Sequence, residues 1–361
     1  MNIRQATSVY EHWLRERMPL LDADLRLKHQ RMAESSFPFL RATFYRWVQL
    51  WPRICPELAR TPRVLGIGDI HVENFGTWRD NEGRLVWGVN DFDEAWRVPY
   101  TNDLVRLAVS AILAIDEKDL SCRPEQACDS ILSGYQDELA SGGAPFVLAE
   151  QHRGLRDWAL GALRDPALYW EKFSSLPAIS SGIPAKVRAD LKRALPEPGL
   201  QFRIVHRRAG LGSLGRRRFT ALAQWRGGWI AREAKELTVS AWQWQQDSRG
   251  RKEILYRRII HQAVRVLDPY IRVQGRWLHR RLAPDCGRIE LGSLPKSRDE
   301  LRLLHAMGAE TANIHLATKA ARRRVLADLR KRPAKWLRKA AEAMAKVTVE
   351  DWKEWAKSMG D

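Results

Sequence analysis

Hydrophobic and polar positions follow two different periods along the chain, and the period changes several times. Residues 1–60 place apolar side chains three and four positions apart, which predicts helices; "SSFPFLRATFYRWVQLW" (35–51) does so around a Pro break. Residues 61–95 instead hold two short β-rich runs, "RVLGIGD" (63–69) and "RLVWGVNDF" (84–92), separated by a turn at "RDNEG". Helical spacing returns from 101 to about 175.

The second half of the chain begins with another change of period. A Pro-, Ser- and Gly-rich stretch at 176–186 indicates the approach to a boundary. After it, "QFRIVHRRAG" (201–210), "RRRFTALAQW" (216–225) and "GWIAREAKEL" (228–237) predict three strands joined by glycine turns. A helix is predicted over 252–268, then a strand pair around 275–291, then helices from 297 to the end. The whole pattern predicts an α+β fold.

Composition indicates a folded protein of the cytoplasm. Hydrophobic residues make up 45% and charged residues 29%, which is typical of globular chains. The start of the chain shows no pattern of a secretory signal. The most apolar stretch, 104–115, contains Arg106 and is too short for a membrane span. The four cysteines form no CxxC pair, which favours a reducing compartment over a disulfide frame or a zinc site.

The charge of the chain points to anionic partners. Sixty-one Lys and Arg against 43 acidic residues give a net charge of +18, which attracts nucleotides, nucleic acid and anionic lipid heads alike. The basic stretch 319–341 with Trp336 is either a solvated helix face or a nucleic-acid-binding surface. Most of the sixteen Trp lie at apolar helical positions, and core packing is the favoured interpretation.

Two acidic motifs carry the candidate chemistry. Asp69 and Asn74 stand as D-x-x-x-x-N, the spacing of a kinase catalytic loop in which the Asp accepts the acceptor's proton and the Asn holds magnesium. Asp91 ends the next β-rich run and begins "DFD", where kinases carry Asp-Phe-Gly. A carboxylate there suits Mg²⁺, with Asp93 as an extra ligand or a structural residue. Asp and Asn are also common turn residues, but two such loops together favour a site.

Two further interpretations stay open at this point. Asp103 in "TNDL" either caps the helix predicted from Leu104 or braces the catalytic loop. "GDIH" also contains D-x-H, the opening of a two-metal phosphoesterase pattern. The rest of that pattern fits poorly, because the late candidate "ANIH" (312–315) lacks its Gly.

A glycine loop and a lysine supply the parts for holding a nucleotide. Gly210, Gly212 and Gly215 stand as G-x-G-x-x-G, with Ser213 between them, and a strand follows where a dinucleotide-binding fold would begin a helix. Lys235 lies in the third predicted strand, as in the nucleotide lobe of a kinase. The loop amides and Lys235 would hold phosphates. The candidate glutamate partner of Lys235 is Glu253, with Gln262 as the alternative; arginines 203, 207, 208, 216, 217 and 218 also suit a polyphosphate.

The chain resembles a known family. "FPFLR", "GDIHVENFG", "NDFDEAW", "NDLVRLAVS", "GLGSLG" and "AKE", in this order over roughly 30–320, are similar to the bacterial family called domain of unknown function 2252. The family is grouped with kinase-like proteins and has no settled activity. The resemblance implies a kinase-like fold and catalytic, metal and nucleotide roles for Asp69, Asn74, Asp91 and Lys235. "GDIHVEN" also resembles the loop of aminoglycoside and choline kinases, which usually begins with His where this chain has Ile67.

These observations predict a two-lobed, kinase-like phosphotransferase that uses ATP and Mg²⁺ on an unknown acceptor. A small-molecule acceptor is favoured, because little space for an activation loop follows Asp91. The predicted parts are a catalytic and metal-loop part (1–190), a β-rich nucleotide lobe (191–292), and helices packing back on the catalytic lobe (293–361). This order inverts that of ordinary kinases, so either the chain is circularly permuted or the kinase interpretation is a coincidence of two motifs. Alternatives are nucleotidyl transfer, a non-catalytic nucleotide- or nucleic-acid-binding protein, and a two-metal phosphoesterase.

Overall fold

The computed structural model describes residues 1–149, 152–161, 165–246, 253–288 and 299–360. Helices and strands are mixed along the chain, which confirms the predicted α+β class. The N-terminal region is helical as predicted, and its elements are α1 (Ile3–Arg15), α2 (Asp22–Glu34), α3 (Ser36–Ala42) and α4 (Phe44–Ile54). The β-rich region that follows contains β1 (Arg63–Gly66), β2 (Phe75–Arg79), β3 (Leu85–Val89) and β4 (Trp96–Pro99).

Helices and a second group of strands make up the rest of the described chain. The helices that follow β4 are α5 (Tyr100–Asp116), α6 (Pro124–Ser141), α7 (Arg153–Gly161), α8 (Pro166–Ser174) and α9 (Ala185–Arg193). The strands and short helices after them are β5 (Arg203–His206), β6 (Arg218–Trp225), β7 (Gly228–Glu236), α10 (Ala241–Gln245), α11 (Tyr256–Gln262), β8 (Arg272–Gln274), β9 (Trp277–Leu282) and β10 (Gly287–Arg288). The last helices are α12 (Glu300–His315), α13 (Arg322–Lys331) and α14 (Trp336–Gly360).

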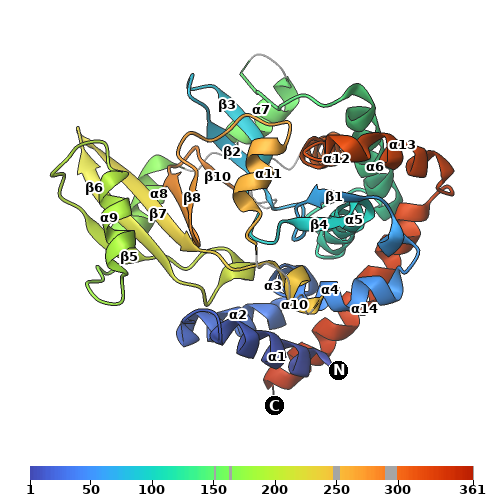
Figure 1. Cartoon of the computed structure of the whole chain (residues 1–361), viewed down its shortest axis with the longest axis horizontal. Coiled ribbons are helices and arrows are strands. Elements are labelled where there is room, and N and C mark those ends of the chain that lie inside the picture. The colour runs from blue at the N-terminus through green and yellow to red at the C-terminus, as the bar shows by residue number, and fades with distance from the viewer. Residues whose placement is uncertain (150–151, 162–164, 247–252, 289–298, 361) are drawn as a thin grey trace.

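Within the described residues, the strands form three antiparallel sheets. The largest has the order β5-β6-β7-β9-β8, a second has the order β10-β2-β3, and β1 pairs with β4. Figure 1 shows the five-stranded sheet on one side of the molecule and most helices on the other, with the β2–β3 hairpin between them. The acidic loops after β1 and β3 therefore lie between the large sheet and the helical part.

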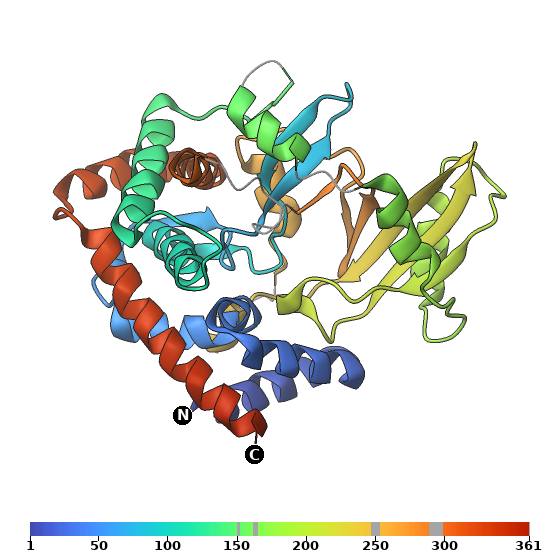
Figure 2. The ribbon, with the colours of Figure 1, turned by 180° about the vertical axis from the view of Figure 1, so that it is seen from behind.

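The main core surrounds α5. This helix is apolar on nearly all sides, and every residue from Tyr100 to Ala114 is buried, as expected for a helix covered on all faces. α6 and α14 pack against it, and α12 packs against α6. Figure 2 shows α14 crossing the back of the molecule to reach α1 and α2, so that both chain ends lie close together.

Side-chain alternation decides which face of the large sheet meets the acidic loops. Ala234 of β7 packs with Val187 and Leu191 of α9 on one face. Because side chains alternate along a strand, Glu233 and Lys235 lie on the opposite face. That face is directed toward the acidic loops, since Lys235 contacts both Asp91 and Asp93.

Several predicted elements differ from those observed. β2 and β4 were not predicted, and the turn at 79–83 joins β2 to β3, whereas β1 pairs with β4. The predicted helix 252–268 is reduced to α11, because the backbone leaves the helix at Ala263 and the amide of Val264 donates to the carbonyl of Asn313. Within the predicted elements, residues 150–151, 162–164, 252, 289–291, 297–298 and 361 lie outside the described residues.

The predicted division at 190/191 falls within α9, and β10 from the predicted nucleotide lobe pairs with β2 of the first part. The division into three parts stays a prediction. Within the described ranges, no helix combines the length and apolar character that crossing a membrane requires.

Candidate functional site

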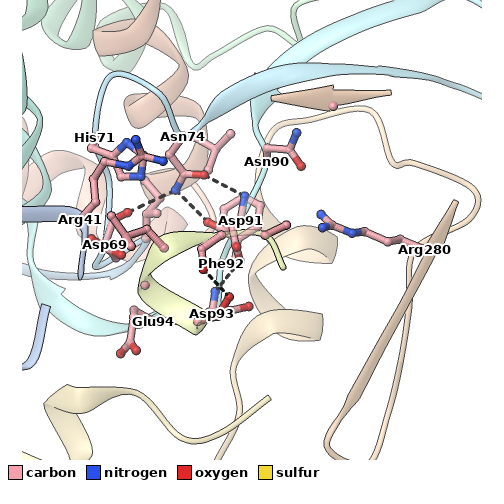
Figure 3. A pocket seen from close by; sticks show the side chains of 18 of the residues that line it. Arg41, Asp69, His71, Asn74, Asn90, Asp91, Phe92, Asp93, Glu94 and Arg280 are labelled. Carbon is pink, nitrogen blue, oxygen red and sulfur yellow. Dashed lines mark hydrogen bonds between the residues drawn. The ribbon is translucent and has the colours of Figure 1, made fainter. Parts of the chain in front are cut away.

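The two acidic loops meet through the side chain of Asn74. Its Nδ2 donates to the carbonyls of Asp69 (3.3 Å) and Asp91 (3.0 Å), and its Oδ1 accepts the amide of Asp91 (3.0 Å). Figure 3 shows these bonds joining the two loops. Asn74 thus fixes the distance between the predicted catalytic and metal loops, and its predicted metal role remains a prediction.

A pocket brings together most of the residues singled out by sequence. Its lining includes Asp69, Asn74, Asp91, Asp93, Gly210, Gly212 and Ser213, which come from segments far apart in the chain. Gly215 and Lys235 are not part of this lining, but Lys235 reaches two of the lining carboxylates. The structure therefore assembles the acidic motifs and the glycine loop around one space.

Asp69 is held by an arginine that sequence reasoning did not assign to the site. Both Nε and Nη2 of Arg106 donate to Asp69 Oδ1, and Nη2 also donates to the carbonyl of Leu40. The side chain of Arg106 is completely buried, and its guanidinium lies over the rings of Phe44 and Trp47. Burial raises the pKa of Asp69, although Arg106 opposes that shift. The sequence feature that could have identified Arg106 is its position as the single charged residue within the apolar stretch 104–115.

Asp103 braces the loop that carries Asp69. Its carboxylate accepts the amides of Ile67 (2.6 Å) and Gly68 (3.1 Å), and it also contacts His315 Nε2 (3.0 Å). Asp103 is fully buried and lies inside α5, whose N-cap position is Pro99. Of the two interpretations left open by the sequence, the structure supports the bracing role and contradicts the capping role.

Lys235 joins the two aspartates of the second acidic loop. Its Nζ lies 2.7 Å from Asp91 Oδ2 and 2.5 Å from Asp93 Oδ2, and the lysine side chain is 1% exposed. Burial opposes the charge of Asp91, but the Lys235 ammonium outweighs it and holds the pKa of Asp91 well below its usual range. Burial and the charge of Asp91 raise the pKa of Asp93 to about 7. Asp91 therefore keeps its negative charge near neutral pH, whereas Asp93 is easily protonated.

The predicted partners of Lys235 are wrong. Glu253 is exposed, and its backbone bonds to the side chain of Gln243. Gln262 is also exposed, and it accepts from Arg258 on the same short helix. Asp91 and Asp93 take the place of the expected glutamate, because the register of β7 aims Lys235 at the second acidic loop.

The glycine loop lies directly against Asp69. A Cβ on Gly212 would stand 3.2 Å from Asp69 Oδ2 and 3.0 Å from the carbonyl of Arg41, so a larger residue would crowd the carboxylate. Gly210 has a φ of +73°, which favours glycine, and the Ser213 hydroxyl donates to its carbonyl (3.1 Å). A Cβ on Gly215 would stand 2.5 Å from Leu25 Cδ2 of α2, so packing against α2 requires glycine here, and the predicted nucleotide-binding role of Gly215 remains a prediction.

The arginines around the glycine loop pair with groups of the protein. Arg207, Arg218 and Arg280 all donate to the buried carboxylate of Glu233, at 2.7 to 3.0 Å. One carboxylate cannot neutralise three guanidinium groups, and all three arginines line the pocket. Figure 3 shows Arg280 pointing toward the acidic loop from the sheet. The predicted arginine set is thus corrected: Arg203, Arg208 and Arg217 bind carbonyls or carboxylates outside the pocket lining.

Helix α2 holds the glycine loop from the other side. The amide of Leu21 donates to the carbonyl of Gly215 (2.8 Å), and Asp24 contacts His206 Nε2 (2.7 Å) and accepts from Arg208 Nε (2.8 Å). Asp24 is 3% exposed. Sequence reasoning did not find this contact, since it joins residues about 180 positions apart.

The bond between Asp24 and His206 predicts a pH-dependent stability. The hydrogen bond that His206 donates to Asp24 raises the pKa of His206. Its contribution to stability is therefore complete below the unfolded pKa of about 6.5 and is lost as the pH rises through the folded pKa. Burial opposes the charge of Asp24, but His206 and Arg208 lower its pKa. The bond between Asp24 and His206 is therefore lost on acidification only below the usual carboxyl range. The melting temperature of His206→Gln should fall below wild type at pH 6, and the difference should shrink by pH 8.5. An unchanged difference would contradict this assignment.

The residues of the phosphoesterase pattern and of the basic stretch 319–341 were the basis of two alternative functions. His315 bonds to Asp103 and Tyr135 in the core, away from His71 of the pocket lining. Among the described residues, no three His, Cys, Asp or Glu side chains are grouped to hold a metal ion by themselves. In the basic stretch 319–341, Trp336 is buried, while the exposed basic residues are Lys319, Arg323, Arg324, Arg330, Lys331, Lys335 and Lys339. Nucleic-acid binding there remains a prediction.

The oxygen donors near Lys235 fit a hard cation that shares phosphate oxygens. Asp91 is 38% exposed on its side chain and accepts from Lys235 and from the amide of Asp93. Asp93 Oδ1 is buried and has no hydrogen-bond partner, an arrangement that costs free energy unless a proton or a cation satisfies the oxygen. Magnesium is usually bound by one or two carboxylates together with phosphates. Asp91 and Asp93 fit that donor set.

Comparison with known proteins agrees with the resemblance. Residues 20–152 match the model of a family described as an uncharacterized protein conserved in bacteria (DUF2252). The matched part contains both acidic loops and Arg106, whereas the glycine loop and Lys235 lie beyond it. No curated protein and no solved structure matches the chain.

Proposed function

We propose that the protein is an ATP- and magnesium-dependent phosphotransferase with a kinase-like arrangement of two lobes. The observation that carries this proposal is the contact of Lys235 with Asp91 and Asp93 beside a glycine loop that lies on Asp69. A lysine, a metal-binding aspartate, a glycine loop and a catalytic aspartate are the parts that phosphoryl transfer from ATP requires. Here they meet although Asp91 and Lys235 are 144 positions apart.

The nucleotide side of the pocket would be held by the large sheet. Backbone amides of the glycine loop and the ammonium of Lys235 are suited to phosphate oxygens. The excess positive charge of the three arginines around Glu233 supports binding of an anion at the same face. Their bonds to Glu233 hold the guanidinium groups in place before any ligand arrives.

Asp91 and Asp93 would hold the magnesium ion, which would neutralise phosphate charge when bound. Asn74 would fix the position of Asp91 through two backbone bonds. Lys235 already neutralises part of the charge of the two carboxylates, so the site favours a metal that arrives with phosphates over a free divalent ion.

Asp69 would accept the proton of the acceptor hydroxyl, or orient that hydroxyl for attack. Arg106 binds only one of its oxygens, Oδ1, and Oδ2 lies beneath Gly212. A carboxyl whose pKa is raised by burial is a better base than an exposed one, as general base catalysis requires.

The inverted order of the motifs is compatible with this proposal. Catalysis depends on where residues meet in space, and the glycine loop reaches Asp69 even though it follows that residue in the chain. A circularly permuted kinase-like fold would produce this order. The close approach of the two chain ends is what such a rearrangement requires.

The proposal predicts a magnesium-dependent stabilisation by ATP. At a concentration of about 100 Kd, a ligand stabilises a folded protein by about 2.7 kcal/mol, which raises the melting temperature by several degrees. Asp91→Asn should weaken binding about tenfold or more, because a metal ligand is lost, and should shrink the rise accordingly. In wild type, omission of magnesium should also reduce the rise in melting temperature caused by ATP. The measurement is a thermal-shift titration with ATP and Mg²⁺.

Asp129→Asn is the matched control, since Asp129 is exposed on α6. This variant should behave as wild type. No ATP-dependent shift in wild type, or an equal shift in Asp91→Asn, would contradict the proposed nucleotide site.

A further inference from the structure

Lys28 is a buried cation that the proposed roles leave unused. It lies on α2, is 4% exposed, and belongs to the lining of the pocket. Its Nζ is 3.5 Å from the carbonyl of Gly212 and 5.7 Å from the centre of the Tyr45 ring. Among the residues that the structure describes, no carboxylate lies within ion-pair distance of this ammonium.

The charges around Lys28 explain why it can receive an anion. Burial lowers the pKa of Lys28 to about 8, and the charge of Arg216 acts in the same direction. Glu11, Glu94 and Asp69 favour the charged form, but from beyond contact distance. A buried cation without a bonded counter-ion costs free energy, which an incoming anion would recover.

Arg41 provides a second donor on the same side of Asp69. Its Nη1 bonds to Glu73 (2.5 Å), while its Nε is buried and has no hydrogen-bond partner. Figure 3 shows Arg41 beside Asp69 at the edge of the pocket. Lys28 and Arg41 therefore flank the proposed catalytic carboxylate from α2 and α3.

The same helices limit the size of an acceptor. α2 is fixed to the glycine loop through Leu21, Leu25 and Asp24, and α3 packs against the short helical turn Leu211–Ser213. The Asp69 side of the pocket is thus lined by the protein's own helices. This arrangement favours a small acceptor over a folded protein substrate.

We propose that the acceptor is a small hydroxyl compound carrying a phosphate or carboxylate group, which Lys28 and Arg41 bind while Asp69 faces the hydroxyl. This inference rests on the proposed function. Lys28 provides a point charge suited to an oxyanion, and the free Nε of Arg41 provides a directed donor.

The test uses small probes of known charge. Wild type and Lys28→Met are titrated calorimetrically with glycerol 3-phosphate, glycerate and glycerol, with and without a saturating non-hydrolysable ATP analogue and Mg²⁺. We expect at least one anionic probe to bind wild type while the analogue is present, and to bind Lys28→Met at least tenfold more weakly. Glycerol should bind neither protein measurably. The phosphate and carboxylate probes distinguish the two anion classes.

Controls separate the two proposals. Lys28→Met removes an unpaired buried charge at nearly constant length, so it should fold with a melting temperature equal to or above wild type. Lys186→Met on α9 is the matched control, because Lys186 is exposed on the far side of the large sheet. Failure of the analogue to bind, with Lys28-dependent binding of an anion, would overturn the proposed function and with it the acceptor role. An anion site at Lys28 would still stand.

Three results would overturn the acceptor proposal. The first is that no anionic probe binds wild type at millimolar concentration. The second is equal binding to Lys28→Met. The third is displacement of the anion by the ATP analogue, together with weaker analogue binding in Lys28→Met, which would assign Lys28 to the nucleotide instead.

Discussion

Asp69→Asn should abolish phosphoryl transfer and also lower the free energy of unfolding by about 3 kcal/mol. Loss of a general base alone costs about 10²–10⁴ in rate. The second effect follows from the structure, because Arg106 is fully buried and both of its bonds to Asp69 end on one carboxylate oxygen. Removing one partner of a buried ion pair leaves the other charge uncompensated, which typically costs 3–5 kcal/mol. Transfer is measured as ADP release, and stability by urea unfolding.

A double variant separates catalysis from stability. Asp69→Asn combined with Arg106→Met removes both charges and should recover most of the lost unfolding free energy, while transfer stays abolished. ATP binding should persist in the double variant, since neither residue contacts Lys235. Recovery of transfer together with stability would show that Asp69 acts only through the fold, and the catalytic assignment would then be wrong.

Asp103→Ala should produce the largest loss of stability among single changes in α5. The substitution would leave the amides of Ile67 and Gly68 and the ring of His315 without their common acceptor, all within the core. We expect the free energy of unfolding to fall by about 3–5 kcal/mol. Transfer should also fall in the part of the population that remains folded, because the loop carrying Asp69 loses its brace.

Asp116→Ala provides the comparison on the same helix. Asp116 is the last residue of α5 and is exposed, so its removal should change the unfolding free energy by no more than about 0.5 kcal/mol. Similar urea midpoints for Asp103→Ala and Asp116→Ala would contradict the bracing role. The unfolding free energy of Asp103→Asn should lie between those of Asp103→Ala and Asp116→Ala, because an amide oxygen can still accept one of the backbone hydrogen bonds.

The acidic loops are features that local sequence patterns predicted. The spacing of Asp69 and Asn74, and the run that ends at Asp91, identified two turns at the ends of β-rich segments, and the structure joins them through Asn74. The same holds for the strands around the glycine loop, where strand-like runs joined by glycine turns located β6 and β7. Such features depend on neighbouring residues, because turn geometry and side-chain alternation are local properties of the backbone.

Partner choice was decided by packing. Sequence reasoning sought a glutamate for Lys235 in the next helix, whereas the antiparallel register of the large sheet turns Lys235 toward Asp91 and Asp93. Arg106 was read only as a charge that interrupts an apolar stretch, and its bond to Asp69 requires α5 to pass beneath the loop. Neither contact has a local signal, since many residues of suitable charge stand at comparable separations along the chain.

The sequence by itself determined the α+β class, the two acidic turns and the glycine-turn strand that carries Lys235, because each is encoded by residue type and period over a few positions. Only the tertiary structure decided that Arg106 holds Asp69, that Asp103 braces its loop, and that α2 brings Lys28 to the pocket. These contacts join segments up to about 180 positions apart, and their formation depends on the packing of the whole core rather than on any local preference.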